Sequence, residues 1–468
     1  MKIALLHYHL KPGGVTTVIR HQVEALQGHG SVMVLAGAPP GTAWPVPVRH
    51  IPGIGYRNDT ATPIDPHKVA REIHQAIRNQ WGGECDLLHI HNPLLAKNHA
   101  FLDILKSLQE RGITLFLQIH DFAEDGRPHA YFQSSYPRDC HYGVINSRDY
   151  SLLLDAGLKP EGLHIVFNPV KPLAANSPPS PGNEILYPVR AIRRKNIGEA
   201  LLLSLYFKHR PALSITLPPN SPADITAYNG WKKFAQKYRL NIRFDAGLDN
   251  EFEQLVGRAR LLLTTSITEG FGYTFLEAWT AGKPVWGRDL ADITRDFTRK
   301  GLRLDHFYRD LLVPLSWMDH QLFFDLWKNC ILENSAPFGL AIVEESIDRA
   351  AEKMIEAGLI DFGLLDEFFQ KQIMCTLLAE PVKKDRLAVI NPFLKNPGLE
   401  GLAHERINHN RQMILDKFSA GFYRESLLNT YQAVMRTPVK QRIDKHCLAA
   451  SFFNLDAFSM LKWGRYAE

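Results

Sequence analysis

The sequence predicts an α/β fold with two Rossmann-like, doubly wound domains facing a cleft, and a helical C-terminal extension. Its 468 residues exceed what one compact core usually holds, so two domains are expected. Short apolar, β-rich runs alternate with longer helical patterns, which is typical of βα units and a parallel sheet. A stretch rich in Pro, Ser, Gly and Asn at 168–183 interrupts this alternation, and a hinge linker is therefore expected at 171–184.

The first domain, expected at 1–170, starts with a buried strand at 3–7. The residues Lys11-Pro12-Gly13-Gly14 separate it from a helix at 15–26. The remaining elements alternate in the same way. Further strands are expected at 31–35, 86–91, 114–120, near 144–145 and at 164–167, and a further helix at 100–111.

The second domain, expected at 185–400, repeats the alternation and then becomes mostly helical. Its expected strands are 185–189, 213–217, 241–244 and 261–265, and its expected helices are 196–206, 252–260 and one from about 274. From about Asp289 onward long helical patterns dominate. The clearest of them lie at 342–357, 364–379 and 405–418.

Composition narrows the classes of function. The net charge of +5 suits an enzyme that handles anionic phosphates, but the dense Lys and Arg runs of a nucleic-acid binder are lacking. Five scattered cysteines without a CxxC pair suggest neither disulfides nor zinc, and a reducing cytoplasm is expected. We expect no signal peptide, and no segment approaches the roughly 18 apolar residues of a membrane span. Peripheral membrane contact stays open.

The most specific segment is SITEGFGYTFLEAWTAGKP at 266–284, which follows an expected strand and turns into an expected helix. Gly270 and Gly272 lack side chains where the backbone would approach a ligand closely. The helix start would offer free N–H groups to a phosphate or a sugar hydroxyl. Glu269 and Glu277 lie eight residues apart, and their carboxylates can accept hydrogen bonds from neighbouring sugar hydroxyls. The alternative is a pair of solvated glutamates beside an ordinary helix.

A second segment, VRAIRRK at 189–195, directly follows the first strand of the second domain. A diphosphate leaving group needs cations, and Arg and Lys supply them. Arg190 and Lys195 are the expected pair, with Arg193 and Arg194 competing for the role. A solvated basic turn is the alternative.

Together these segments resemble the E-x7-E signature of retaining glycosyltransferases with the GT-B architecture, especially family 4. The resemblance implies that Glu269 contacts the transferred sugar and that Glu277 binds the ribose hydroxyls of the nucleotide. It also implies that the backbone of Gly270, Phe271 and Gly272 lines the sugar pocket, with Tyr273 beside it. Arg190 and Lys195 would neutralise the pyrophosphate, although Val189 stands where the family usually has Gly.

Two first-domain features fit the same resemblance. The loop with Gly13 and Gly14 would let a helix start face the donor phosphate, with a plain tight turn as the alternative. His120 ends an expected strand and precedes Asp121, like the His-Asp pair frequent in the family, and can donate a hydrogen bond or move a proton. A structurally packed His is the alternative. His89 and His91 share a strand face, but no carboxylate pattern completes a metal site, so they are interpreted as core or acceptor-side residues.

The function implied is retaining, metal-independent transfer of a hexose from a UDP-, GDP- or ADP-sugar to a hydroxyl acceptor, without a cofactor. The expected catalytic residues are Glu269, His120, Arg190 and Lys195. The expected donor-binding residues are Gly13, Gly14, Arg190, Lys195, Glu269, Gly270, Phe271, Gly272, Tyr273 and Glu277. In this architecture acceptor residues lie in first-domain loops such as 92–99 and 122–136. The acceptor itself stays open among a small polar molecule, a glycan and a lipid-linked sugar.

The resemblance covers about residues 1–290, with a weaker echo at 418–431, so helices at 401–468 are expected to recross to the first domain. Between these parts the sequence departs from the family, which leaves any donor contact from the loop at 288–294 in doubt. One alternative function is a non-catalytic GT-B protein that binds a nucleotide sugar as a sensor or a subunit. The retention of Glu269, Glu277, Arg190 and Lys195 argues against it. A pyridoxal-dependent phosphorylase is a third candidate, and a homodimer stays open.

Overall fold

The computed structural model describes residues 1–57, 63–173, 183–395 and 404–465, which form two compact units. Unit 1 comprises Met1–Pro169, Pro337–Leu340 and Phe418–Phe453, and unit 2 comprises Val170–Ala336, Ala341–Lys417 and Asn454–Glu468. The chain thus returns to unit 1 late in the sequence and ends in unit 2. Most of the expected hinge linker, residues 174–182, lies outside the described residues.

A seven-stranded sheet with only parallel neighbours forms the centre of unit 1. Its order is β3-β2-β1-β4-β5-β6-β7, which is that of a doubly wound sheet growing outward from its first strand. The strands are β1 (Lys2–His7), β2 (Ser31–Ala36), β3 (Val48–His50), β4 (Leu87–His91), β5 (Leu115–Gln118), β6 (His141–Val144) and β7 (Leu163–Ile165).

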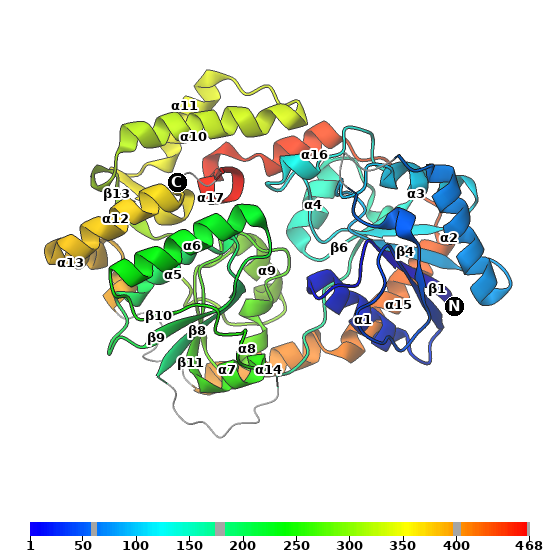
Figure 1. The fold of residues 1–468 in the computed structure, drawn as a ribbon, viewed down its shortest axis with the longest axis horizontal. Helices are drawn as coiled ribbons and strands as arrows, with labels where there is room; N and C mark the ends of the chain where they lie inside the picture. Colours follow the sequence, from blue (N-terminus) through cyan, green and yellow to red (C-terminus); the bar gives the residue numbers. More distant parts are fainter. Residues whose placement is uncertain (58–62, 174–182, 396–403, 466–468) are drawn as a thin grey trace. The chain divides into compact units, whose positions relative to one another are not determined.

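Helices cover both faces of this sheet. Successive side chains of a strand point to opposite faces, and in β1 Ala4 and Leu6 belong to one buried cluster whereas Ile3 and Leu5 belong to the other. The first face is covered by α2 (Pro66–Trp81), α3 (Phe101–Glu110), α4 (Ser147–Asp155) and α16 (Lys445–Phe452). The second is covered by α1 (Gly14–Leu26) and α15 (Ala420–Arg436), which lie side by side (Figure 1).

Unit 2 has a five-stranded parallel sheet of order β10-β9-β8-β11-β12. The strands are β8 (Glu184–Arg190), β9 (Ala212–Leu217), β10 (Ile242–Arg243), β11 (Ala259–Thr264) and β12 (Val285–Gly287). Around them lie α5 (Ile197–Ser204), α6 (Pro222–Lys237), α7 (Phe252–Arg258), α8 (Glu277–Thr280), α9 (Ala291–Arg299), α10 (His320–Ser335), α11 (Glu344–Met354), α12 (Glu367–Ala379), α13 (Pro381–Ile390), α14 (His404–Lys417) and α17 (Met460–Trp463). A short antiparallel pair, β13 (Leu312–Pro314) and β14 (Leu359–Asp361), completes the unit. The expected class, two Rossmann-like sheets with a helical C-terminal part, is confirmed.

The helices expected at 401–468 divide between the two units. Helices α15 and α16 belong to unit 1, and α14 and α17 belong to unit 2. Helix α15 belongs to unit 1 because Tyr423, Leu427 and Tyr431 join the same buried cluster as α1.

The sequence patterns did not predict several helices of the structure, among them α2, α6, α10 and α13. Helix α2 shows why. Asp65 caps it, since its carboxylate accepts from His67 N at 2.9 Å, and Pro66 starts it. Yet only Val69, Ala70, Ile73 and Ile77 are buried, which makes an apolar stripe too narrow to stand out in a polar segment.

The helix expected from about Thr274 is broken in the structure. Tyr273–Phe275 form a 3-10 turn, Leu276 leaves the helical region at φ −120°, and α8 spans only Glu277–Thr280. Phe275 and Leu276 are neighbours and both are fully buried, which the non-helical backbone of Leu276 permits. The expected helix N-terminus as an anion site is therefore wrong, since no helix of useful length starts at the glycine turn.

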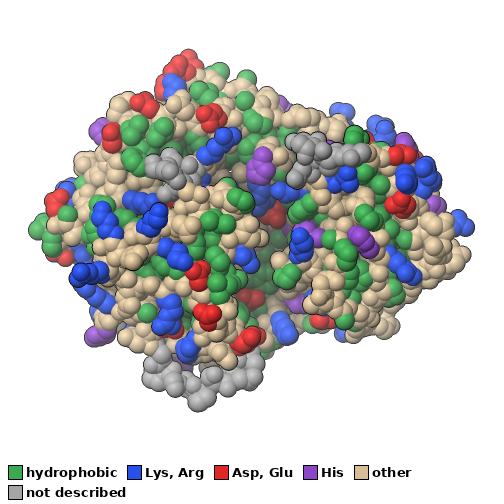
Figure 2. Space-filling model, in the orientation of Figure 1, with side chains coloured by type: hydrophobic (Ala, Val, Ile, Leu, Met, Phe, Trp, Pro, Cys, Tyr) green, Lys and Arg blue, Asp and Glu red, His purple; other side chains and the backbone are tan. Residues whose placement is uncertain are grey.

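Charged side chains of both signs are spread over the face that Figure 2 shows. Lys and Arg side chains occur there singly or in small groups, interspersed with acidic ones (Figure 2). No helix among the described residues is both long enough and apolar enough to span a membrane.

Candidate active site

The backbone of Lys195 is fixed at the carboxyl end of the unit 2 sheet, where ligands bind in open α/β folds. The hydroxyl of Tyr187, on β8, donates to Lys195 O at 2.6 Å. The hydroxyl of Thr265, directly after β11, donates to Lys195 O at 3.2 Å and to Asn196 O at 3.0 Å. Asn196 has a left-handed backbone (φ 51°), which ends the 3-10 turn Arg193–Lys195 and starts α5. Two strands and a helix start thus hold Lys195 in place.

The side chain of Lys195 forms an ion pair with the carboxylate of Glu269. Both groups are mostly buried, with side-chain exposures of 13% and 11%. Burial alone would raise the pKa of Glu269, but the charges of Lys195 and Arg194 outweigh it and hold this pKa below its ordinary value. Glu269 is therefore ionised at neutral pH. An ammonium and a carboxylate thus lie together at the carboxyl end of this sheet.

The other cations of the basic segment have different surroundings. The side chain of Arg193 is 9% exposed and pairs with Glu367 at 2.7 Å, so it supports the packing of α12. Arg190 is exposed, and its guanidinium donates to Pro218 O at 3.0 Å. Lys195 and Arg194 therefore interact with Glu269, whereas the guanidinium of Arg190 donates a hydrogen bond to the carbonyl of Pro218. Sequence spacing alone could not separate four neighbouring cations.

The glycine turn depends on Gly272, whose φ of 84° is unfavourable for other residues. A Cβ at this position would also lie 3.0 Å from Phe275 and 3.1 Å from Ile293. Phe271 is buried, with its ring against Tyr273 at 5.0 Å and Phe297 at 5.9 Å. The side chain of Phe271 therefore anchors the turn in the core. Gly270 is half-buried, next to Glu269.

Glu277 opens α8 and has an unusual environment. Burial, reinforced by the charge of Glu253, raises its pKa to about 7. Within the described part of the chain, no donor or cation contacts its carboxylate. Such a group is suited to accept hydrogen bonds from a ligand that brings its own hydroxyl donors.

Glu277→Gln is expected to flatten the pH dependence of stability of the unliganded protein. Between the ordinary pKa of 4.5 and the folded value of about 7, the native state holds more protons than the unfolded state. The free energy of unfolding therefore falls as pH rises through this window, and Gln removes that contribution. Chemical denaturation at about pH 5 and about pH 8 measures the effect, with Glu352→Gln, on the exposed face of α11, as control. Equal pH slopes in wild type and Glu277→Gln would contradict the assignment.

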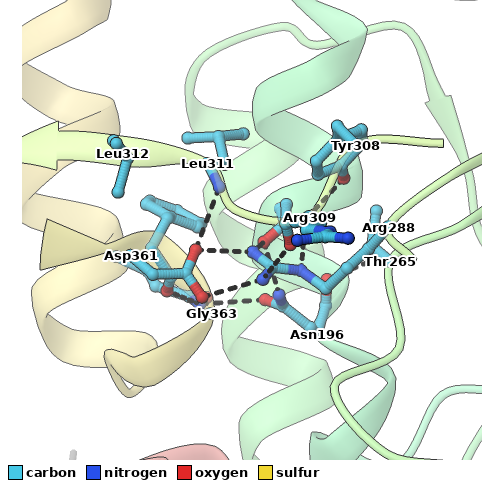
Figure 3. Close-up of polar contacts among 12 residues, drawn as sticks. Asn196, Thr265, Arg288, Tyr308, Arg309, Leu311, Leu312, Asp361 and Gly363 are labelled. Atoms are coloured by element: carbon cyan, nitrogen blue, oxygen red, sulfur yellow. Dashed lines mark hydrogen bonds and ion pairs between the residues drawn. The ribbon is translucent and has the colours of Figure 1, made fainter. Parts of the chain in front are cut away.

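Arg288 lies in a buried ion-pair network (Figure 3). Its guanidinium contacts both oxygens of Glu199, at 3.0 and 2.6 Å, and both oxygens of Asp361, at 2.8 Å each. Tyr308 OH donates to Glu199 at 2.5 Å, and Asn196 Nδ2 donates to Glu199 at 2.7 Å. The network thus joins β12, α5 and β14 and reaches the residue that follows Lys195.

In unit 1, His120 follows β5 and is 7% exposed. Its Nε2 lies 3.0 Å from Nδ1 of His91, and its backbone N–H donates to Asn92 Oδ1 at 2.7 Å. Burial lowers the pKa of His120 to about 4, against the opposing charge of Asp121, so the ring is neutral at pH 7. A neutral ring can donate or accept one hydrogen bond, but it cannot supply a positive charge.

The other histidines and the first glycine loop have simpler surroundings. His89 and His91 are fully buried, and His89 Nδ1 lies 2.8 Å from the hydroxyl of Tyr431 on α15. Among the described residues no group of three or more His, Cys, Asp or Glu is arranged to hold a metal. Gly13 is the N-cap of α1 without a side-chain cap, and a Cβ at Gly14 would meet no atom within 4 Å. Open space lies beside this helix start.

Comparisons with known proteins agree with this fold. No protein-family model matches the chain. The chain is similar to the mannosylglucosyl-3-phosphoglycerate synthase of Petrotoga mobilis, with 27% identity and 98% of each chain covered. Among solved structures it is similar to a glycosyltransferase from Rickettsia africae (TM-score 0.54, 11% identity, 93% of this chain and 99% of that chain). Anabaena HepE in complex with UDP and glucose gives a TM-score of 0.54 at 11% identity, with 92% and 99% covered. At these identities the structures establish the fold.

The two-sheet architecture is thus that of GT-B glycosyltransferases, as the sequence predicts. The full-length similarity to a sugar-product synthase agrees with it, and the expected enzyme class, a glycosyltransferase, is confirmed at that level.

Proposed function

We propose that this chain is a retaining, metal-independent glycosyltransferase that resembles family 4 and moves a hexose from a nucleotide-diphosphate sugar to a hydroxyl acceptor. The observation that carries the proposal is the arrangement after β8 and β11, where Lys195 pairs with Glu269 and Glu277 lacks a partner among the described residues. A nucleotide sugar supplies what these groups require. Its diphosphate is anionic, and its ribose and hexose hydroxyls are hydrogen-bond donors.

Each residue has a defined role in this proposal. Lys195, with Arg194 or Arg190, stabilises the departing diphosphate, on which most of the charge develops. Glu269 holds the hexose and Glu277 the ribose, with the turn from Gly270 to Tyr273 beside the sugar. Gly13 and Gly14 leave room for a phosphate at the start of α1, and His120 hydrogen-bonds a sugar hydroxyl.

The bond from the anomeric carbon to the diphosphate oxygen breaks, and a bond from that carbon to the acceptor oxygen forms on the same face. The acceptor proton passes to the departing phosphate oxygen, so no side-chain nucleophile is required.

The name of the Petrotoga mobilis relative suggests the acceptor to test first. Its product carries a mannosyl unit, a glucosyl unit and 3-phosphoglycerate. We propose that this chain makes a product of the same class by glycosylating a glucoside of 3-phosphoglycerate. Similarity over 98% of both chains supports this transfer of function better than a shared domain would.

A thermal-shift panel of UDP, GDP, ADP and their sugars tests the donor site. One nucleotide series is expected to raise the melting temperature of wild type, because a ligand at a hundredfold its Kd adds about 2.7 kcal/mol to the stability. The shift should collapse in Glu277→Ala and persist in Glu352→Ala, which changes an exposed glutamate on α11. If no nucleotide stabilises the wild type, the donor site is not where we place it.

Product analysis then separates an enzyme from a binding protein. With the stabilising donor and the glucoside, NMR should show a new glycoside with the donor's anomeric configuration, formed equally well in excess EDTA. If the protein binds the donor but neither transfers the sugar nor slowly hydrolyses the donor, a nucleotide-sugar sensor would be favoured instead.

A further inference from the structure

We infer that Lys97, Arg127 and His129 of unit 1 form a subsite for the phosphate and carboxylate groups of an anionic acceptor. This inference rests on the proposed glycosyl transfer, and it names the part of the chain that would select a phosphorylated acceptor.

Two loops at the carboxyl end of the unit 1 sheet bring these residues together. One loop follows β4, the other follows β5, and Ala96 N donates to Ala130 O at 2.8 Å to join them. The 3-10 turn Pro128–Ala130 carries His129 and closes through a bond from Ala130 N to Arg127 O at 2.9 Å. Lys97 directly follows Ala96, and the charge of its side chain lowers the pKa of His129 on this turn.

Arg127 connects the cluster to the candidate catalytic histidine. Its Nη2 donates to Asp121 Oδ1 at 2.7 Å, and Asp121 directly follows His120. Asn92 Oδ1 accepts from both His120 N and Asp121 N, at 2.7 and 3.0 Å. An anion held by Arg127 would therefore lie beside Asp121, the residue that follows His120.

The positive charges of the cluster repel one another. Lys97 and Arg127 are both cationic, Asp121 pairs with Arg127, and the charge of Asp125 also acts on Arg127. No carboxylate in the described part of the chain forms an ion pair with Lys97, which is half-buried. Burial, together with repulsion from Arg127, lowers the pKa of Lys97, and burial with Lys97 and Arg127 lowers that of His129. An anion would relieve this repulsion.

Aromatic side chains border the cluster. The ring of Tyr56 is 54% exposed and packs against the rings of His9 and Tyr8, with centroids 4.9 and 5.2 Å apart. The charges of Asp121 and Arg127 act on its hydroxyl, which places Tyr56 beside the same ion pair. A flat, partly exposed ring next to an anion site suits a sugar that carries an acidic aglycone.

Direct titration tests the subsite without turnover. We expect 3-phosphoglycerate to bind to the wild-type protein and glycerate to bind more weakly. Lys97→Met should lower the affinity for 3-phosphoglycerate about tenfold to a hundredfold, which corresponds to the loss of one charge-assisted hydrogen bond. Lys97→Arg should restore part of the affinity. Lys106→Met removes an exposed charge from α3 of the same unit and should change nothing. In NMR the pKa of His129 should rise when 3-phosphoglycerate binds.

Steady-state kinetics distinguish this inference from the proposed function. We expect the ratio of kcat/KM for the phosphorylated over the unphosphorylated glucoside to fall at least tenfold in Lys97→Met. If 3-phosphoglycerate does not bind to the wild-type protein, or if Lys97→Met lowers only the affinity for the donor, the assignment of the subsite is wrong. If 3-phosphoglycerate binds as expected but neither glucoside is glycosylated, the proposed function fails and the anion subsite stands.

Discussion

Lys195→Met is expected to lower kcat about a hundredfold to a thousandfold, the usual cost of one preorganised group that stabilises transition-state charge. Lys195 forms an ion pair with Glu269, and its backbone is held by Tyr187 and Thr265. Substitution therefore removes a charge that the backbone holds in a fixed position beside Glu269. The effect should appear in kcat more than in KM, since the leaving diphosphate is most charged in the transition state.

Two controls make this prediction specific. Lys233→Met removes an exposed charge from α6 and should leave kcat unchanged. Glu269→Gln should lower kcat as well, and the double variant should lose less than the product of the two single losses, because the partners act as one unit. Methionine at position 195 also leaves Glu269 without its partner, so circular dichroism must first show a folded protein. A folded Lys195→Met variant with wild-type kcat would exclude Lys195 from the reaction.

The second large effect concerns stability. Arg288→Met is expected to lower the free energy of unfolding of unit 2 by about 3 to 5 kcal/mol, because it leaves two carboxylates without their cation. Glu199 is fully buried and Asp361 is 14% exposed, so water cannot replace the guanidinium. With about 2 to 4 °C per kcal/mol in a domain of this size, the melting temperature should fall by roughly 10 °C.

Differential scanning calorimetry measures this loss. Arg295→Met, on the exposed face of α9, serves as the matched control and should stay within about 0.5 kcal/mol of wild type. Adding Glu199→Gln to Arg288→Met should recover part of the lost free energy of unfolding, because it removes one of the two carboxylate charges that lack a partner. A fall of less than about 1 kcal/mol in Arg288→Met would mean that water or a rearranged side chain compensates the carboxylates.

The sequence determined the fold because its main signals are local. The strands of both sheets are buried on two faces, so they appear as continuous apolar runs such as IALLH and LLLTT, and the helices between them follow from periodicity. The candidate residues Glu269, Glu277 and Lys195 could be proposed from the sequence, because the segments that carry them resemble a known glycosyltransferase motif and follow strand ends, which meet at one edge of a parallel sheet.

Only the tertiary structure decided among residues that sequence treats alike. The sequence does not distinguish the four cations of VRAIRRK. In the structure Arg193 forms an ion pair with Glu367, on a helix far along the chain, and Arg190 donates a hydrogen bond to the carbonyl of Pro218. The helix after the glycine turn was predicted too long, since periodicity cannot reveal that Phe275 and Leu276 must both be buried. Arg288 and Lys97 interact with carboxylates between 24 and 89 residues away, namely Asp121 for Lys97 and Asp361 and Glu199 for Arg288. Charge pairing in a folded chain is set by distance in space, and a single sequence does not contain that distance.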